Sequence, residues 1–161
     1  MKEMNIYNLN QIKLFVYDFD GVMTNNKFTL DVHGNEQVSL NRSDGLAISM
    51  LKEIGYKQLI MSTENSQLVA LRAKKLGIDY LIGIENKFDE LRKYVSSLHL
   101  KFSQVAYVGN DTNDFEAMNL VHLRICPKDA QNSIKEICHL VLDKNGGEGV
   151  IREILFRLNG V

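Results

Sequence analysis

The chain has 161 residues, with 19 lysines and arginines against 20 aspartates and glutamates, a formal net charge of -1 and a hydrophobic share of 45%. Its length is typical of one compact domain, and we expect residues 1–161 to form a single unit. One proline and 11 glycines exclude collagen-like and low-complexity chains. The near-neutral charge provides no basic field for a nucleic acid or an anionic membrane, so we expect neither as a partner.

Cysteine content and the amino-terminal sequence predict a cytoplasmic protein. Cys126 and Cys138 are too few for a disulfide framework or a four-cysteine zinc site, and their spacing forms no CxxC pair. We expect both to be buried thiols in a reducing compartment. Residues 1–11 are interrupted by asparagines and lack the apolar stretch of a signal peptide. No apolar run approaches the roughly 18 residues of a transmembrane helix.

Short apolar runs, each closed by polar or glycine residues, predict strands that are buried on both faces. In chain order they are Ile12–Tyr17, Gln58–Ser62, Tyr80–Ile84, Val105–Gly109, Leu123–Cys126 and a weaker run, His139–Leu142. Apolar residues at helical spacing lie between these runs. The predicted helices are Gly45–Ile54, Ser66–Leu76, Phe88–Leu98, Asn113–Met118, Ala130–Ile137 and Val150–Leu158. Because strands and helices alternate, we predict an α/β, Rossmann-like three-layer sandwich with a mainly parallel central sheet.

One segment interrupts this alternation directly after the first strand, and it predicts a β-hairpin insertion over about residues 27–40. Its strands would be Phe28–Val32 and Gln37–Leu40, joined by His33, Gly34 and Asn35. Phe28, Leu30 and Val32 occupy alternating positions, as in a strand with one buried face. This apolar face either packs on its own domain or is covered by another chain.

Polar side chains follow four of the predicted strands, which is where ligands bind in open α/β sheets. They are Asp18 and Asp20 after the first strand, Ser62, Thr63 and Glu64 after the second, Lys87 after the third, and Asn110 and Asp111 after the fourth, with Asp114 following. Carboxylate and amide oxygens suit Mg²⁺ together with a substrate phosphate. Each residue alone is more typical of a solvated loop or a helix cap, but their order at successive strand ends favours a metal site that binds phosphate.

These motifs resemble those of the haloacid dehalogenase superfamily of phosphatases. The matching residues are Asp18-Phe19-Asp20-Gly21-Val22, Ser62, Lys87 and Gly109-Asn110-Asp111. Further segments resemble the capless branch that includes 3-deoxy-manno-octulosonate 8-phosphate phosphatase and nonulosonate 9-phosphate phosphatases. They are Asn35-Glu36, Arg42-Ser43-Asp44-Gly45-Leu46, Arg72-Ala73-Lys74-Lys75-Leu76-Gly77 and Gly146-Gly147-Glu148-Gly149-Val150-Ile151-Arg152-Glu153. The resemblance spans Lys13 to Glu153.

The resemblance implies a Mg²⁺-dependent phosphatase that works through an aspartyl-phosphate intermediate. Asp18 would be the nucleophile, Asp20 the general acid and base, and Lys87 a further catalytic residue. The metal would be held by Asp18, by the backbone carbonyl of Asp20, and by Asn110 or Asp111. The implied phosphate- and substrate-binding groups are Ser62, the loop N–H groups of Phe19, Asp20 and Thr63, and the side chains of Glu64, Arg42 and Arg152.

Two positions depart from the octulosonate phosphatases. In that branch an aspartate directly follows the glycine of the fourth motif, whereas this chain has Asn110, whose amide offers less charge to Mg²⁺. Glycine and arginine follow the serine of the second motif there, whereas Thr63 and Glu64 stand here. This loop is closer to nonulosonate phosphatases and to the phosphatase-like domain of acylneuraminate cytidylyltransferases. A glutamate repels a substrate carboxylate, so the sequence slightly favours a nonulosonate 9-phosphate over 3-deoxy-manno-octulosonate 8-phosphate.

The sequence leaves no room for a cap domain, because the predicted hairpin, strands and helices fill the intervals from Asp20 to Ser62 and from Ser62 to Lys87. An open site would leave the phosphorylated intermediate in water. In the resembling branch, adjacent subunits of a tetramer close the site. The resemblance therefore implies a homotetramer with the hairpins packed together, and a small phosphorylated sugar acid as the substrate.

Two alternatives stay open. One is a weakly catalytic or non-catalytic oligomerisation module associated with a CMP-sugar acid synthetase, which Asn110 and the Thr63-Glu64 loop favour. The intact pair of Asp18 and Asp20 argues against it, because a pure scaffold has no need for two carboxylates at a strand end. The other alternative is a phosphatase for macromolecular phosphoesters, which an open site permits.

Overall fold

The computed structural model describes residues 9–159 and contains a six-stranded sheet in the order β5-β4-β1-β6-β7-β8. The strands are β1 (Leu14–Asp18), β4 (Lys57–Met61), β5 (Asp79–Leu81), β6 (Val105–Val108), β7 (Leu123–Cys126) and β8 (Leu140–Val141). Every pairing in this sheet is parallel. β1 lies at the centre, and the chain builds outward from it first to one side and then to the other, which places a crevice at its carboxyl end.

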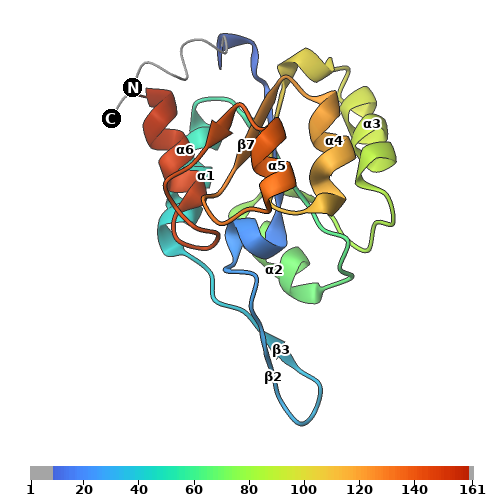
Figure 1. Cartoon of the computed structure of the whole chain (residues 1–161), viewed down its shortest axis with the longest axis vertical. Helices are drawn as coiled ribbons and strands as arrows, with labels where there is room; N and C mark the ends of the chain where they lie inside the picture. The colour runs from blue at the N-terminus through green and yellow to red at the C-terminus, as the bar shows by residue number, and fades with distance from the viewer. Residues whose placement is uncertain (1–8, 160–161) are drawn as a thin grey trace.

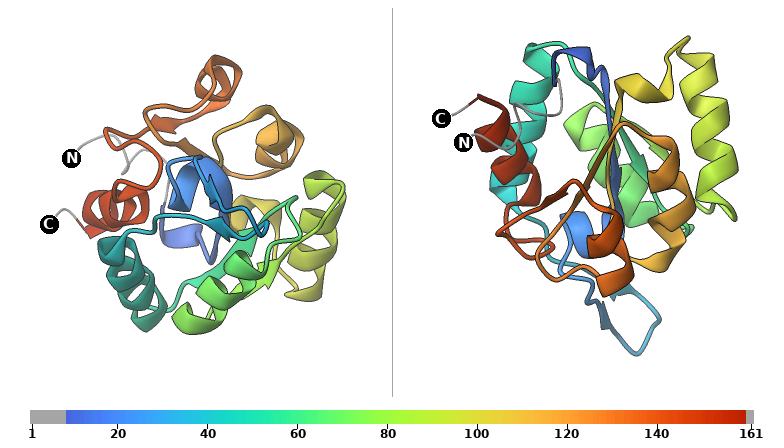
Figure 2. Two further views of the ribbon diagram at one scale, coloured as in Figure 1. Left: turned by 90° about the horizontal axis from the view of Figure 1, so that it is seen from below. Right: turned by 45° about the horizontal axis from the view of Figure 1, so that its top comes forward.

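Helices cover both faces of the sheet (Figure 1, Figure 2). One face carries α1 (Arg42–Glu53), α2 (Gln67–Leu76) and α6 (Val150–Asn159), and the other carries α3 (Lys87–Ser97), α4 (Phe115–Leu120) and α5 (Asn132–Ile137). Phe15 and Tyr17 of β1 pack in the apolar cluster on the α1 side, whereas Leu14 and Val16 pack in the cluster on the α3 side. The structure confirms the predicted three-layer α/β sandwich, and residues 9–159 hold no inserted cap domain.

The helices differ from their predicted ranges mainly at their first residues. α1 begins at Arg42 rather than at Gly45, because Asn41 caps it by accepting a hydrogen bond from the backbone N–H of Ser43 at 2.8 Å. The fourth predicted helix begins as a 3₁₀ turn over Thr112–Asp114 before α4 starts. Two further 3₁₀ turns, Leu9–Gln11 and Phe102–Gln104, were not predicted.

The chain leaves β1 through a tight turn that the sequence pattern did not predict. Residues Phe19–Met23 form one π-helical turn whose φ and ψ angles depart from helical values at Asp20 and Gly21. Gly21 has a φ of 86°, and a Cβ at this position would overlap the side chain of Asn110, so only glycine fits here. The turn directs the acidic residues of the first motif into the crevice at the end of β1.

The predicted hairpin is present with shorter strands. β2 (Thr29–Leu30) pairs antiparallel with β3 (Glu36–Gln37), and the hairpin extends away from the sheet at the carboxyl end of the central strands (Figure 1). Asp31 organises the turn, because its carboxylate accepts hydrogen bonds from the backbone N–H groups of His33 and Asn35 at 2.8 and 2.9 Å.

The apolar side chains of the hairpin are exposed. Phe28, Leu30 and Val32 are 60%, 59% and 96% accessible to solvent. The possibility that this face packs on its own domain is therefore wrong for the single chain. A surface of this kind is typical of an interaction site.

Two other expectations concern the cysteines and membranes. Cys126 is buried and Cys138 is partly buried, and both are free thiols. Within the part of the chain that the structure describes, no helix has the length and apolar character needed to cross a membrane.

Candidate active site

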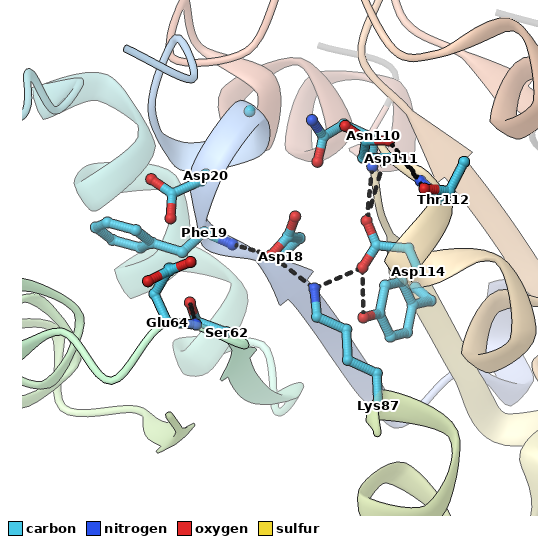
Figure 3. Close-up of polar contacts among 12 residues, drawn as sticks. Asp18, Phe19, Asp20, Ser62, Glu64, Lys87, Asn110, Asp111, Thr112 and Asp114 are labelled. Atoms are coloured by element: carbon cyan, nitrogen blue, oxygen red, sulfur yellow. Dashed lines mark hydrogen bonds and ion pairs between the residues drawn. The ribbon is translucent and has the colours of Figure 1, made fainter. Parts of the chain in front are cut away.

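The ends of three neighbouring strands bring the predicted site residues together (Figure 3). Asp18 ends β1, Ser62 follows β4 and Asn110 follows β6. These residues border a cavity of about 320 Å³, called here the catalytic cavity. Its lining residues are Asp18, Asp20, Asn26, Ser62, Thr63, Glu64, Asn110, Asp111, Thr112 and Asn113. Motifs far apart in the sequence therefore form one polar crevice.

Lys87 is a buried cation between two carboxylates. It is the first residue of α3, and its Nζ donates to Asp18 Oδ1 at 2.8 Å and to Asp114 Oδ1 at 2.7 Å. The Lys87 side chain is 1% exposed. Burial lowers the pKa of Lys87, but the charges and hydrogen bonds of Asp18 and Asp114 outweigh burial and raise it overall. Lys87 is therefore an ammonium at neutral pH, as Figure 3 shows it between the two acids.

Asp114 holds Lys87 and the loop after β6 in place through its carboxylate. Its side chain is fully buried, and its Oδ1 accepts a second hydrogen bond, from the Tyr107 hydroxyl at 2.9 Å. Its Oδ2 accepts from the backbone N–H groups of Asn110 at 2.9 Å and Asp111 at 3.3 Å. A buried carboxylate with this many donors is fully satisfied. Asp114 thus fixes both Lys87 and the loop that follows β6.

The carboxylate of Asp18 faces the catalytic cavity, and its partners neutralise its negative charge only in part. Its Oδ1 accepts from Lys87 and from the backbone N–H of Phe19 at 2.8 Å. Burial, followed by the Asp114 charge, raises the pKa of Asp18 to about 7, although Lys87 lowers it. Since one ammonium serves two buried carboxylates, the site carries excess negative charge. A second cation beside Asp18 would favour its ionised form.

The oxygens around Asp18 fit such a cation. The side-chain amide of Asn110 lies against Asp18 Oδ2 and the carbonyl oxygen of Asp20; with its nitrogen turned toward them it donates at 2.8 and 2.9 Å. With its oxygen turned toward them, three oxygens converge without a hydrogen between them. Oxygens bound to Mg²⁺ at about 2.1 Å lie about 3 Å apart in an octahedron, so these spacings suit the ion. We call Asp18 Oδ2, Asp20 O and Asn110 Oδ1 the three-oxygen corner.

The three-oxygen corner is not a cluster of acidic side chains. Over residues 9–159, no three His, Cys, Asp or Glu side chains gather in a way that could hold a metal. The corner instead combines a carboxylate, a backbone carbonyl and an amide. The alternative ligand Asp111 lines the cavity, but its Oδ1 accepts from the backbone N–H of Thr112 at 2.7 Å and caps the 3₁₀ turn. The geometry favours Asn110 over Asp111 as the ligand.

Asp20 lines the catalytic cavity, and its side chain is partly buried. Burial, followed by the charge of Glu64, raises the pKa of Asp20, while a hydrogen bond from Thr24 lowers it. A carboxyl group with a raised pKa holds a proton more readily near neutral pH. This property suits a general acid.

The loop after β4 completes the lining. Ser62 is 2% exposed, and its Oγ accepts from the backbone N–H of Glu64 at 3.2 Å, so the hydroxyl also shapes the turn. Thr63 and Glu64 line the same cavity. The N–H of Phe19, predicted as a phosphate donor, donates to Asp18 in this structure.

Two predicted ligands lie elsewhere in the single chain. Arg42 is exposed at the start of α1, and Arg152 is exposed on α6, where its Nη1 lies 3.6 Å from Met50 Sδ. The backbone N–H of Arg152 donates to Asp44 Oδ1 at 2.9 Å. Neither arginine lines the catalytic cavity. Their role as substrate ligands stays a prediction that one chain alone does not fulfil.

The sequence did not single out Tyr107 or Thr24, and it indicated Asp114 only as a carboxylate that follows the fourth motif, without its supporting role. Asp114 follows the fourth motif in a stretch that also suits an ordinary turn and helix cap. Tyr107 gave a usable signal, because a tyrosine inside a strand buried on both faces needs a partner for its hydroxyl. Thr24 was hidden by the unpredicted π-helical turn.

A model of the haloacid dehalogenase-like hydrolase family matches residues 2–154. The chain belongs to this family. Among relatives of this hydrolase, the 3-deoxy-D-manno-octulosonate 8-phosphate phosphatase KdsC of Yersinia pestis is 31% identical over 144 residues, which cover 89% of this chain and 77% of the relative. The N-acylneuraminate cytidylyltransferase A of Danio rerio is 30% identical over 148 residues. That match covers 88% of this chain but only 34% of the cytidylyltransferase.

A solved structure shows the same relationship. The 3-deoxy-D-manno-octulosonate 8-phosphate phosphatase from Moraxella catarrhalis, in complex with a magnesium ion, a phosphate ion and a KDO molecule, superposes with a TM-score of 0.92. It is 28% identical, and the match covers 97% of this chain and 91% of that one. The family and its phosphatase members identify this hydrolase as a phosphoric monoester hydrolase, which confirms the predicted resemblance and enzyme class.

Proposed function

We propose that this hydrolase is a Mg²⁺-dependent phosphatase that removes the terminal phosphate of a 2-keto-3-deoxy sugar acid through a phosphorylated Asp18. The observation that carries the proposal is the buried Asp18–Lys87 pair beside the three-oxygen corner. The nucleophile Asp18 and the metal ligands border one cavity, which a second carboxylate, Asp20, also lines, while the buried cation Lys87 contacts Asp18.

In the first step, an oxygen of Asp18 attacks phosphorus, and the bond between phosphorus and the sugar oxygen breaks. Asp20 donates its proton to the departing sugar oxygen. Lys87 favours the ionised form of Asp18 and orients its carboxylate, and Ser62 offers its hydroxyl to the phosphoryl oxygens. Mg²⁺ held by the three-oxygen corner would supply positive charge next to the phosphoryl group.

In the second step, Asp20 takes a proton from a water molecule, whose oxygen attacks the phosphorus of phosphorylated Asp18. The bond between Asp18 and phosphorus breaks, which releases inorganic phosphate and restores both carboxyl groups. One residue thus serves first as acid and then as base. Its raised pKa, caused first by burial and next by Glu64, supports this double role.

The sugar part of the substrate has a place beside Asp20. A cavity of about 360 Å³ lies at the base of the hairpin and shares Asp20, Asn26 and Glu64 with the catalytic cavity. The leaving oxygen must lie within reach of Asp20, so the sugar would extend into this hairpin-base cavity. Lys27 is the cation among its lining residues and suits a substrate carboxylate.

Two kinds of observation bear on the identity of the sugar acid. The similarity to octulosonate 8-phosphate phosphatases from Yersinia pestis and Moraxella catarrhalis supports a 3-deoxy sugar acid phosphate. Glu64 lines both cavities, where a carboxylate attracts hydroxyl and amide groups and repels another carboxylate. On this basis we retain a slight preference for a nonulosonate 9-phosphate over the octulosonate.

We also propose that the hydrolase is a homotetramer in which neighbouring subunits close the catalytic cavity. The exposed apolar side chains of the hairpin, Phe28, Leu30 and Val32, support a contact between copies of the chain. The hairpin that carries them projects from the carboxyl end of the central strands (Figure 1), the end at which Asp18, Ser62 and Asn110 border the catalytic cavity. Arg42 and Arg152, which are exposed in one chain, would then be available to a neighbour's site.

A second candidate function is an oligomerisation module of a CMP-sugar acid synthetase. The observation that favours it is the match to 34% of the Danio rerio cytidylyltransferase. The buried Lys87 with its two carboxylates argues against a scaffold, because a scaffold has no use for excess charge at the end of β1.

Metal dependence and the roles of the two aspartates can be tested with p-nitrophenyl phosphate. We expect hydrolysis with Mg²⁺, its loss in EDTA and its recovery when Mg²⁺ is restored. Asp18→Asn should lower the rate by at least about 10⁴-fold, since it removes the nucleophile. Full activity in EDTA, or in D18N, would contradict the proposed mechanism, whereas inactivity of the folded wild type would favour the scaffold.

A further inference from the structure

Thr24 is a fully buried threonine just beyond the π-helical turn that carries Asp20. Its hydroxyl oxygen has three polar neighbours. The backbone N–H groups of Gly21 and Asn26 donate to Thr24 Oγ1 at 3.3 and 3.1 Å. Asp20 Oδ1 lies 3.4 Å from the same oxygen. The hydroxyl therefore joins the backbone of the turn to the side chain of its acidic residue.

The direction of these hydrogen bonds follows from the chemistry of a hydroxyl group. A threonine hydroxyl has two lone pairs and one hydrogen. The two N–H groups occupy both lone pairs, so the hydrogen is left to donate to Asp20 Oδ1. Oδ1 is thereby fixed as an acceptor, and Oδ2 is the oxygen left to carry a proton.

We propose that Thr24 is the positioning residue for Asp20, which holds Oδ1 of the carboxyl group so that Oδ2 exchanges the proton with the leaving sugar oxygen. This inference rests on the proposed function, in which Asp20 is the general acid. Over residues 9–159, the bond from Thr24 is the one hydrogen bond to the Asp20 carboxyl group. Without it, rotation of the carboxyl group would be free, and the proton would be delivered from a less defined position.

The carboxyl-terminal glycine loop holds Thr24 in place. A Cβ on Gly146 would lie 2.8 Å from the Thr24 carbonyl oxygen, and a Cβ on Gly147 would lie 2.8 Å from the Thr24 carbonyl carbon, so neither position has room for a side chain. The N–H of Gly147 also donates to the carbonyl oxygen of Val22 at 3.0 Å. The loop before α6 thus packs directly on the turn that positions Asp20.

The test depends on how much help the leaving group needs. p-Nitrophenolate is a stable anion that departs without a proton, whereas a sugar alkoxide needs the general acid. Loss of Thr24's hydroxyl should therefore slow the sugar phosphate selectively. Because Asp20 is also the base of the second step for both substrates, the readout is release of the leaving group in a single turnover with enzyme in excess, which precedes that step. A general acid contributes about 10²–10⁴-fold, so we expect Thr24→Val to lower this rate at least about tenfold for 3-deoxy-D-manno-octulosonate 8-phosphate and less than about threefold for p-nitrophenyl phosphate.

Three further variants make the result interpretable. Thr24→Ser keeps the hydroxyl and should restore the single-turnover release of the sugar to within about threefold of wild type. Asp20→Asn should show the same selectivity in leaving-group release in stronger form, and it should also slow the second step on both substrates. Thr24→Ala is measured in parallel with thermal melts, because Thr24→Val leaves the N–H groups of Gly21 and Asn26 without an acceptor, whereas the smaller alanine leaves room for water.

An equal loss of leaving-group release from both substrates in folded Thr24→Val or Thr24→Ala would overturn the positioning role and indicate that Thr24 only supports the fold of the turn. An unchanged rate of release from both substrates would overturn it as well. If wild type hydrolyses p-nitrophenyl phosphate but neither octulosonate nor nonulosonate phosphates, the proposed substrate class fails. The selectivity of Thr24→Val is then tested on the best alkyl phosphate, so the two failures are distinguishable.

Discussion

At the carboxyl end of β1, Lys87 is shared by two buried carboxylates that differ in how they affect folding. Asp114 accepts hydrogen bonds at both oxygens from Lys87, Tyr107 and two backbone N–H groups. Asp18 has fewer donors, and its pKa is raised to about 7, first by burial and then by Asp114. Because an unfolded aspartate titrates near 3.9, the ionised form of Asp18 opposes folding at neutral pH. The catalytic group is thus a source of instability.

We expect Asp18→Asn and Asp114→Asn to change the free energy of unfolding in opposite directions in EDTA. Asp18→Asn removes a charge that disfavours the folded state, so its unfolding midpoint in urea at pH 7 should equal or exceed that of wild type. Asp114→Asn breaks the anchor of Lys87 and should lose about 3 kcal/mol. Circular dichroism would follow the unfolding. A D18N protein less stable than wild type by more than about 1 kcal/mol would contradict this account.

Substitutions of the two candidate metal ligands, Asn110 and Asp111, should affect Mg²⁺ binding differently. Asn110→Asp adds charge to the three-oxygen corner and should lower the Kd for Mg²⁺ by about tenfold, because ligand charge sets affinity at sites of this kind. Asp111→Asn should change the Kd by less than about threefold, since its carboxylate caps the turn at Thr112. Isothermal titration calorimetry with Mg²⁺ measures both without reference to turnover. The reverse order of effects would assign the metal to Asp111.

Asp44 provides a test of pH-dependent stability outside the catalytic cavity. Burial raises the pKa of Asp44. Hydrogen bonds from the backbone of Arg152 and Ile151 and the charge of Arg72 lower it, but burial has the larger effect. One oxygen, Oδ2, is buried without a hydrogen-bond partner. The folded pKa exceeds the unfolded value of about 3.9, so wild type loses stability relative to Asp44→Asn as pH rises from about 4. Urea midpoints of the two proteins should diverge between pH 4 and pH 7; constant or converging midpoints would contradict this.

At the scale of elements, apolar periodicity predicted the order of strands and helices along the chain and a mainly parallel sheet, but not the exact ends of the elements or the order of strands within the sheet. The first strand was predicted from a short apolar run closed by polar residues, which is typical of a strand buried on both faces. The structure confirms the strand and its burial. The turn over Phe19–Met23 could not be predicted, because it depends on contacts of Gly21 with Asn110 from another strand end. The hairpin was predicted from its turn residues, whereas the exposure of its apolar face depends on how far it projects.

The exposed hairpin should control oligomeric state. We expect wild type to be a tetramer in multi-angle light scattering, and Val32→Glu to shift it toward smaller species, because a carboxylate is costly to bury in an apolar contact. Val141, which is 40% exposed on β8, provides a matched control, and Val141→Glu should remain a tetramer. A Val32→Glu protein that keeps the wild-type mass, or a monomeric wild type, would contradict the proposed assembly.

At the scale of the whole molecule, the parallel sheet explains why widely separated motifs form one site. The strand ends bring Asp18, Ser62 and Asn110 together, and this much was predictable from the order of strands alone. Asp114's role could not be predicted, because it is defined by its partners Lys87 and Tyr107 on other elements. The predicted arginine ligands, Arg42 and Arg152, lie away from the cavity of the single chain. Their position could not be predicted, because sequence spacing does not say which side of a helix faces a neighbouring subunit.

The most direct test of the central claim is phosphate release from a substrate panel with Mg²⁺. The panel holds 3-deoxy-D-manno-octulosonate 8-phosphate, two nonulosonate 9-phosphates and common hexose phosphates, with Asp18→Asn as the background. We predict that a 3-deoxy sugar acid exceeds every hexose phosphate in kcat/KM by at least about tenfold, equivalent to about 1.4 kcal/mol of transition-state binding. A nonulosonate in first place supports the role of Glu64, and the octulosonate in first place removes that preference while keeping the mechanism. Release no faster than the Asp18→Asn background for every member of the panel would contradict the account.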